Sequence, residues 1–446
     1  MNMRALFASA VLIFTLLIFS AVARAQEHDA PKVEVGVQFS SLSITPPNSA
    51  STENAAGIGA RVTYNFNDHF AVEAEGDFFP VGLQQNFATG GHVEQAQFGV
   101  KWGKRWQKFG VFAKARPGFV SFDDTIKITR MTVAVVPGAT PRPINFFSSE
   151  RKSHLSADIG GVLEFYPSRR MLVRFDAGDT IIRYREHDEL NESLGFLTRE
   201  EQPVVKAPAD TQHNFQFSAG VGFRFRGGAG DKDDDTPKAS GSSGRSRRFE
   251  VGAQFSSLAL RLHTRDFGFP FFGPFDAGTQ TEAGFGGRVG FNFNDHLALE
   301  AEGDFYPRER SPDSTTGGFP AQMQFGAKVG RRFRRFGVFA KARPGFVTFS
   351  SVNTLVGTDT ITLLGNQQFI TPVFGERRRT YFSTDVGGVL EFYPSRRVLT
   401  RFDFGDTIIR FGRRNAQTFL ITDPGFQIPA ETRHNFQFIA GLGFRF

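Results

Sequence analysis

Two pairs of closely spaced carboxylates are the first residues that could carry out chemistry. Glu73 and Glu75 lie two positions apart, and Glu300 and Glu302 repeat this spacing. Carboxylates placed close together can serve as general acid and general base. In an extended strand, however, residues two apart share one face, and here that face also carries lysine and arginine. We therefore expect ion pairing, and we predict that the chain is not an enzyme.

An acidic residue near a histidine is the second pattern with chemical potential. Asp210 and His213 lie three positions apart, and Glu431 and His434 repeat this arrangement. A hydrolase would need a further histidine or serine partner, and no such partner occurs in both copies. The nine histidines are scattered singly and lack metal-ligand spacing. The sequence therefore predicts no catalytic residue, no metal site and no cofactor.

These residues lie in segments whose hydrophobic period is two, which is the period of a β-strand. In residues 213–225, apolar side chains alternate with polar residues and glycine. Most such segments have roughly the ten residues that a tilted strand needs to cross a bilayer. The first half of the chain contains eight of them, near 33–44, 57–66, 69–79, 94–103, 109–120, 154–166, 171–184 and 213–225.

The predicted connections alternate between short and long. Residues 67–68, 104–108 and 167–170 form short turns, whereas 45–56, 81–93, 121–153 and 185–212 form long loops. Transmembrane barrels have short periplasmic turns and long external loops. The stretches 126–136 and 355–364 are rich in β-prone residues. We expect them to extend a hairpin outward, with an edge on which a partner strand could pair.

The chain carries the same unit twice. The sequence FGVFAKARPGFV begins at Phe109 and again at Phe336, and GGVLEFYPSRR begins at Gly160 and again at Gly387. Between the copies, a stretch rich in glycine, serine, aspartate and lysine predicts a flexible linker. The expected domains are a first barrel repeat at 26–226, the linker at 227–248 and a second barrel repeat at 249–446.

One face of the predicted strands carries acidic and basic residues in nearly equal numbers. In hydrocarbon no backbone polar group can stay unpaired, so a sheet must close. A small closed barrel must then be filled from inside, and buried charges are tolerated when they are paired. We therefore predict an ion-paired network inside each repeat, made of Arg61, Glu73, Glu75, Asp77, Lys114, Arg116, Glu164, Arg174, Asp176, Arg288, Glu300, Glu302, Asp304, Lys341, Arg343, Glu391, Arg401 and Asp403.

The N-terminal segment has the features of an export signal. Arg4 precedes an apolar run at 8–22, and the A-x-A motif ending at Ala25 predicts cleavage there, which removes residues 1–25. The chain has no cysteine, which excludes disulfides. Its net charge of +7 comes from 52 basic and 45 acidic residues. This near-balance argues against nucleic acid as a partner.

The last strand alternates to a terminal aromatic, with Phe444 and Phe446 at its end. This pattern resembles the assembly signal of outer-membrane proteins, which the barrel-insertion machinery reads. The period, loop asymmetry and terminal Phe together resemble the eight-stranded outer-membrane barrel family of OmpA-like and OmpX-like proteins. The resemblance implies an all-β, antiparallel up-and-down transmembrane barrel. It also implies the outer membrane of a Gram-negative-type bacterium as the location, with the lipids of that membrane as partners.

Two arrangements fit the sixteen predicted strands. Each repeat closes into its own eight-stranded barrel, or all strands form one sixteen-stranded barrel. The long polar linker favours two barrels. We expect a structural or surface-interaction role through the long external loops, with an unknown external partner. The alternative is a porin-like passive channel, because about sixteen strands leave an aqueous channel whereas about eight leave an interior that side chains fill. An outer-membrane hydrolase is the least favoured reading.

Overall fold

The computed structural model describes residues 31–49, 52–134, 142–191, 202–225, 248–261, 278–363, 367–416 and 426–446. Every regular element in these residues is a β-strand, and all strand pairs are antiparallel, which confirms the predicted fold class. Within these ranges no helix is long and apolar enough to cross a membrane. The predicted signal segment with Ala25 and positions 227–247 of the predicted linker lie outside the described residues.

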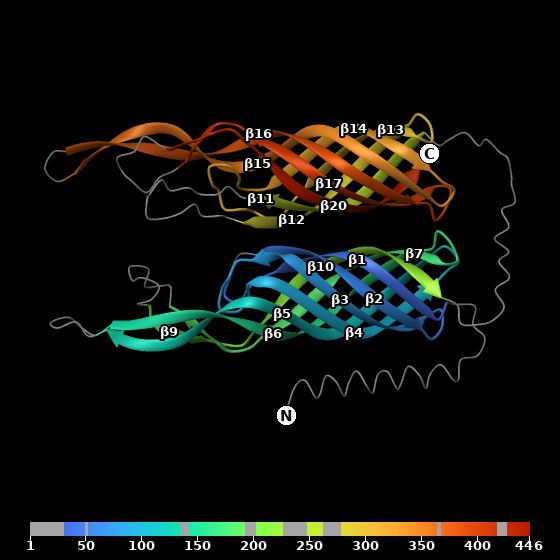
Figure 1. The fold of residues 1–446 in the computed structure, drawn as a ribbon, viewed down its shortest axis with the longest axis horizontal. Coiled ribbons are helices and arrows are strands. Elements are labelled where there is room, and N and C mark those ends of the chain that lie inside the picture. Colours follow the sequence, from blue (N-terminus) through green and yellow to red (C-terminus); the bar gives the residue numbers. More distant parts are fainter. Residues whose placement is uncertain are drawn as a thin grey trace, which may run out of the picture.

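The strands of the first half pair in a closed ring, which we call ring 1 (Figure 1). Its first strand, β1 (Val33–Ile44), pairs with β2 (Glu53–Asn65) on one side and with β10 (Asp210–Phe225) on the other. Each intervening strand pairs with its neighbours in sequence, and β7 pairs with β10. These strands are β3 (Phe70–Leu83), β4 (Gly91–Arg105), β5 (Phe109–Ala134), β6 (Arg142–Phe165) and β7 (Met171–Tyr184).

The second half forms ring 2 by the same pairing scheme. Its first strand, β11 (Phe249–Arg261), pairs with both β12 (Thr279–Asn292) and β20 (Glu431–Arg445). Between them lie β13 (Leu297–Phe305), β14 (Pro320–Arg332), β15 (Phe336–Leu363), β16 (Gln367–Phe392) and β17 (Val398–Phe411). Among the described residues, the two rings share one bridge, in which Asn54 of β2 pairs with Thr281 of β12.

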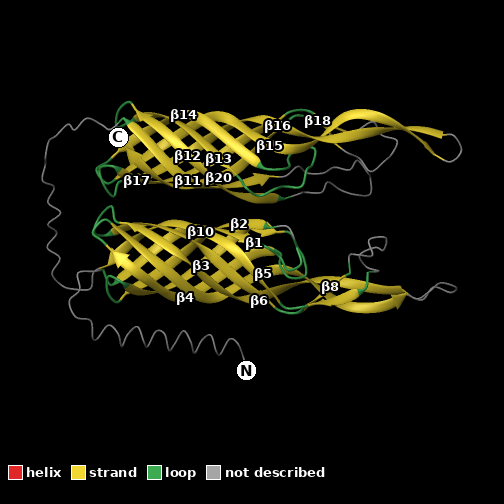
Figure 2. Cartoon of the chain, turned by 180° about the vertical axis from the view of Figure 1, so that it is seen from behind, coloured by secondary structure: helices red, strands yellow, loops and turns green. Residues whose placement is uncertain are grey.

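Two strands of each ring extend well beyond the others as a two-stranded ribbon. In ring 1 the pairing of β5 with β6 continues from the barrel to Ala134 and Arg142, and in ring 2 the pairing of β15 with β16 continues to Leu363 and Gln367. Most of the predicted loop at 121–153 is therefore strand. The expected outward extension of the hairpin is confirmed, because β-prone residues there pair across the hairpin. Both ribbons lie at the same end of the rings, opposite the short turns (Figure 2).

Small two-stranded sheets accompany the ribbons. In ring 1, β8 (His187–Leu190) pairs with β9 (Val204–Ala207), and in ring 2, β18 (Arg414–Ala416) pairs with β19 (Phe426–Ile428).

The strands place polar residues inside the rings and apolar residues outside. Along β10, Asn214, Gln216 and Ser218 are buried inside the ring, whereas Phe215 and Phe223 are 41% and 60% exposed. This is the reverse of a water-soluble barrel, whose apolar side chains face inward. The alternation of the sequence produces it directly, because successive side chains of a strand point to opposite faces.

Candidate functional site

Ion pairs fill the interior of ring 1. Arg174 on β7 donates to both carboxylate oxygens of Glu73 on β3, at 2.5 and 2.9 Å. Arg116 on β5 donates to Glu75 at 2.5 Å and to Asp158 on β6. Lys114 lies 2.7 Å from the same Asp158 carboxylate. The Arg174–Glu73 pair joins strands on opposite sides of the ring, so the network crosses the interior.

The interior of ring 2 repeats this network with equivalent residues. Arg401 donates to both carboxylate oxygens of Glu300 and also to Asp403. Arg343 donates to Glu302 at 2.6 Å and to Asp385 at 3.0 Å. Because both copies preserve donors and acceptors together, charge pairing fills each interior separately.

All eighteen predicted network residues are buried, and none is more than 5% exposed. Fifteen of them form ion pairs, and three do not pair with any charge in the described residues: Asp77, Arg288 and Asp304. The carboxylate of Asp77 accepts hydrogen bonds from Ser40 and Gln38. Asp304 likewise accepts a hydrogen bond from Gln254. For the two aspartates, amide and hydroxyl donors replace the predicted ion pairing. The Nη1 atom of Arg288 is buried and has no hydrogen-bond partner among the described residues.

The sequence analysis did not include Arg105 and Arg332 in the network. Arg105 donates to Glu34 at 3.1 Å and to Asn65 at 3.0 Å, and Arg332 makes the equivalent contacts with Glu250 and Asn292. Arg105 lies four positions after the inward-facing Lys101, and Arg332 lies four positions after Lys328. Because residues an even number of positions apart share one face of a strand, this spacing could have predicted that both arginines face inward.

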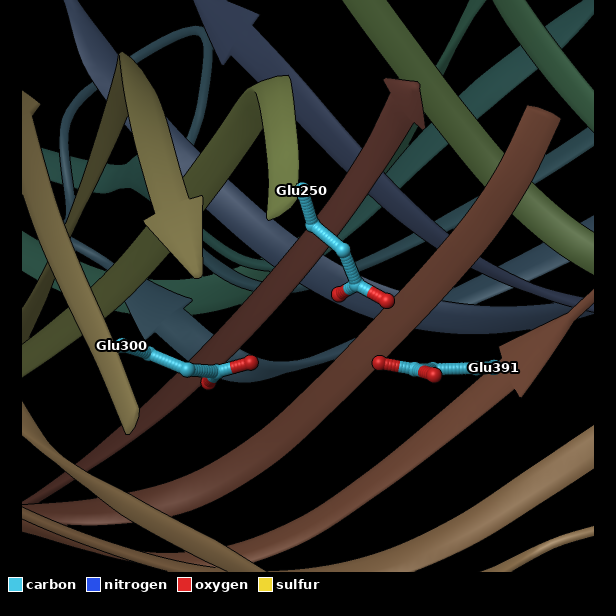
Figure 3. Close-up of side chains that lie close together, drawn as sticks. All are labelled: Glu250, Glu300 and Glu391. Carbon is cyan, nitrogen blue, oxygen red and sulfur yellow. The ribbon is translucent and has the colours of Figure 1, made fainter. Parts of the chain in front are cut away.

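Three glutamates of ring 2 point toward one another in the manner of a metal site (Figure 3). They are Glu250, Glu300 and Glu391. The ammonium of Lys328 already lies among them, 2.9 Å from Glu300, 3.5 Å from Glu250 and hydrogen-bonded to Glu391. In ring 1, Lys101 takes the same place, 2.5 Å from Glu164. A lysine therefore supplies the positive charge that a cation would bring.

The two histidines of the Asp210/His213 and Glu431/His434 motifs lie outside the rings. The Nδ1 atom of His213 is 2.5 Å from a carboxylate oxygen of Asp179 on β7, and His434 pairs with Asp406 in the same way. Residues three apart in a strand face opposite sides, so Asp210 cannot reach His213. Both histidine side chains are more than 60% exposed.

An apolar layer closes each ring on the ribbon side. In ring 1, Leu42, Phe79, Phe122 and Tyr184 belong to one cluster in which each of these four is fully buried. Ring 2 has an equivalent cluster that contains Leu258, Tyr306, Phe349 and Phe411. Each interior thus combines an ion-paired section with an apolar section nearer the ribbon.

Arginines gather at the ribbon end of ring 2. A hollow of about 520 Å³ there is lined by Arg379, Arg410, Arg413 and Arg414, together with uncharged residues that include Leu355 and Phe382. Arg414 also pairs with Glu431.

Residues 12–225 match the family model for the outer membrane protein beta-barrel domain. This half of the chain belongs to that family. The match includes every strand of ring 1, and the second half repeats its motifs. Membership indicates the outer membrane as the location of this β-barrel protein.

Several solved outer-membrane structures resemble the chain. The attachment invasion locus protein Ail of Yersinia pestis is 13% identical over 44% of this chain and 99% of its own, with a TM-score of 0.27. Neisserial surface protein A is 10% identical over 44% of this chain and 100% of its own, with a TM-score of 0.27. A Pseudomonas aeruginosa FadL homologue is 10% identical over 94% of this chain and 90% of its own, also with a TM-score of 0.27. No curated protein sequence matches the chain.

Proposed function

We propose that the chain is a non-enzymatic outer-membrane protein made of two separate, occluded eight-stranded barrels. Its role is structural or surface-interacting and is carried by the parts that project at the ribbon end. The observation that carries this proposal is the filled interior. Arg174 and Glu73 meet inside ring 1, and fully buried Phe122 belongs to the apolar layer nearer the ribbon.

The strand pairing supports two barrels over a single wide one. In each ring the first strand pairs with the last, and one bridge, Asn54 with Thr281, connects the rings. A sixteen-stranded barrel would need continuous pairing between the halves, and it would enclose an aqueous channel. The charges inside each ring also find their partners within the same ring, which a wide lumen would not require.

The projecting ribbons support a surface-interaction role. Asp124 and Ile126 of β5 donate backbone hydrogen bonds to Gly90 and Asn86. In the described part of ring 1, no strand pairs with the outer edges of the ribbon beyond Ile126 of β5 and Leu155 of β6. Unpaired strand edges can accept an added strand from a partner. The arginine-lined hollow of ring 2 adds a basic surface at the same end.

Planar-bilayer conductance of the refolded mature protein tests the occluded interior. We expect little or no steady conductance from protein whose folding is verified by circular dichroism and by a mobility difference between unheated and heated samples. Large, stepwise conductance from folded protein would replace this proposal with a porin function.

For the surface role, both ribbons are replaced by short Gly-Ser turns at 124–151 and 351–378. We expect the variant without ribbons to lose binding to cells or surfaces. A control variant altered in the short turn 104–108 should keep it.

The absence of catalysis has its own test. Neither exposed histidine pair has a third reactive side chain among its described contacts. We therefore expect that His213→Ala with His434→Ala leaves any lipase or protease activity of purified protein unchanged. A loss of measurable activity in this variant would support a hydrolase instead.

Export and assembly form part of the same proposal. Cleavage after Ala25 predicts Gln26 as the first residue of the protein isolated from the outer membrane, which N-terminal sequencing measures.

The proposed assembly signal contains Phe444 and Phe446. The backbone nitrogen of Phe446 donates to the Phe249 carbonyl at 2.9 Å. Phe446→Ser should reduce assembly strongly. Phe225→Ser, at the equivalent internal position, is the matched control and should have little effect.

A further inference from the structure

One outward face of each ring is buried although outward side chains elsewhere are exposed. Val37 and Ile58 are 61% and 67% exposed, as expected for side chains that face lipid. In contrast, outward-facing Phe175, Phe402 and Phe438 are at most 8% exposed. Ring 1 and ring 2 lie side by side in both views, with β1 and β10 near β11 and β20 (Figures 1 and 2). The other ring therefore covers this face, which we call the seam.

Four aromatic contacts join the rings across the seam in the described residues: three stacks, and an edge contact of Phe215 with Phe285 whose ring centroids lie 6.2 Å apart. The rings of Phe39 and Phe438 stack with their centroids 4.0 Å apart, and those of Phe217 and Phe255 stack at 4.1 Å. The interplanar angles of these two contacts, 22° and 24°, are nearly equal. The third contact is a stack of Phe175 on Phe402 at 6.0 Å and 11°. Offset stacking of this kind is favourable for aromatic pairs.

The repeat relates the three stacks to one another, whereas the Phe215–Phe285 contact has no aromatic counterpart because Ile58 stands at the position equivalent to Phe285. Phe39 and Phe255 occupy the same place in the QFSSL motif of each copy, and Phe217 and Phe438 occupy the same place in HNFQF. Exchanging the two copies therefore converts the first contact into the second. Phe175 and Phe402 are themselves equivalent, in the RFD motif, so their contact maps onto itself.

The single strand bridge follows the same rule. Asn54 and Thr281 are separated along the chain by the same number of positions as Phe175 and Phe402, so they are also equivalent residues. A two-fold axis produces two kinds of contact: pairs of contacts that interconvert when the two copies are exchanged, and contacts between equivalent residues. An arbitrary contact between two tethered barrels would not produce both kinds.

We propose that the seam is an isologous interface that holds the two barrels as a fixed, pseudo-two-fold pair within one membrane. Lipid is as apolar as the seam, so association must come from close packing rather than from the hydrophobic effect. Small residues permit that close approach. The seam contains them in equivalent pairs, because Ser41 and Ser257 are each 2% exposed, and Ala219 and Ala440 are 2% and 1% exposed.

A fixed pair has a consequence for the external surface. A flexible linker alone would let the barrels diffuse apart to its full reach, whereas the seam keeps both ribbons at one end and at one spacing. The two ribbons differ in charge, since Glu150 of ring 1 corresponds to Arg377 of ring 2. The chain then presents two unlike surfaces together, and a partner that contacts both gains from their effective concentration.

Cysteine cross-linking of the full chain tests this proposal. The chain has no native cysteine, so introduced pairs react without background. One variant combines Phe39→Cys with Phe438→Cys, and a second combines Phe217→Cys with Phe255→Cys. The control combines Phe98→Cys with Phe325→Cys, which are equivalent positions on β4 and β14, across each ring from β10 and β20. A protease site is placed within 227–248, and a short bifunctional thiol reagent is applied to membranes before cleavage.

We expect both seam pairs to keep the two halves covalently joined after cleavage, while the control separates. Failure of both seam pairs in folded protein would overturn the proposal, as would equal linkage of the control or linkage only between different chains.

A second measurement avoids changing the seam. After cleavage, the unmodified halves should migrate together in mild detergent, whereas the Phe175→Ala/Phe402→Ala variant should separate. Separation of the unmodified halves would also overturn the proposal.

Discussion

Arg174 and Glu73 meet across the interior of ring 1 through two parallel hydrogen bonds of 2.5 and 2.9 Å. Their strands, β7 and β3, have three strands between them on either side of the ring. Both residues are 1% exposed. The pair therefore links opposite walls of the barrel, and the geometry is the bidentate arrangement that an arginine and a carboxylate favour.

Removing one member of this pair should destabilise the barrel. We expect Arg174→Met to lower the free energy of unfolding by about 3–5 kcal/mol, because buried Glu73 and Asp176 lose their hydrogen-bonded cation. Lys101 and Arg116 lie 4.0 and 3.7 Å from Glu73, farther than Arg174. Urea unfolding in lipid vesicles measures the change. The double variant Arg174→Met/Glu73→Gln is the control and should recover a large part of the loss. A single variant as stable as the parent would contradict the interior network.

Gly59 should not tolerate a larger residue. A Cβ at this position would lie 2.0 Å from Oδ1 of Asp77 and 2.6 Å from the carbonyl oxygen of Gly76. We expect Gly59→Ala to cost about 1–3 kcal/mol of unfolding free energy, as overpacked interiors do. Gly161→Ala is the matched control, since no atom lies within 4 Å of its added Cβ. Its effect should stay within about 0.5 kcal/mol, and similar losses in both variants would refute the argument.

The apolar layer should contribute by packing. Leu42 is fully buried in this layer of ring 1, so Leu42→Ala should cost about 2–5 kcal/mol through lost contacts and a residual cavity. Leu42→Met keeps the volume and should cost less than about 1.5 kcal/mol. Unfolding midpoints of the two variants provide the comparison. If both variants unfold like the parent, the layer is not packed as described.

The ribbon of ring 1 should weaken in acid. The Nζ atoms of Lys127 and Lys152 lie 2.9 and 3.3 Å from the carboxylate oxygens of Glu150. Partial burial raises the pKa of Glu150, but the two lysines have the larger combined effect and hold this pKa below its ordinary value. A lowered pKa in the folded state contributes stability above the unfolded pKa, and this stability is lost as the pH falls through the folded pKa. The Glu150 side chain is partly exposed, so solvent screening keeps the effect small.

Hydrogen exchange of amides in the β5–β6 ribbon measures this effect between neutral pH and about pH 3, below the ordinary pKa of glutamate. We expect faster ribbon opening at the lower pH, after correction for intrinsic exchange. Glu150→Gln should remove the difference. The β15–β16 ribbon is an internal control, because Arg377 takes the place of Glu150 there. Equal acid sensitivity of the two ribbons would exclude the assigned cause.

Local alternation explains most of what the sequence predicted correctly. The inward position of Glu73, Arg116 and Arg174 followed from a period of two, because each strand sends successive side chains to opposite faces. The same rule predicted outward phenylalanines such as Phe223. The alternation also continues to Arg105, which lies in the predicted short turn 104–108 although its guanidinium donates to Glu34 inside the ring.

The sequence by itself determined strand positions, the inner and outer faces and the repeated unit, because these depend on residues near one another along the chain. Only the tertiary structure decided which partners meet. Asp77 and Asp304 receive neutral donors rather than cations, and His213 pairs with Asp179 rather than with Asp210. The stacking of Phe39 on Phe438 likewise joins opposite ends of the chain. These contacts depend on ring closure, strand stagger and the approach of the two rings, which alternation along a strand does not encode.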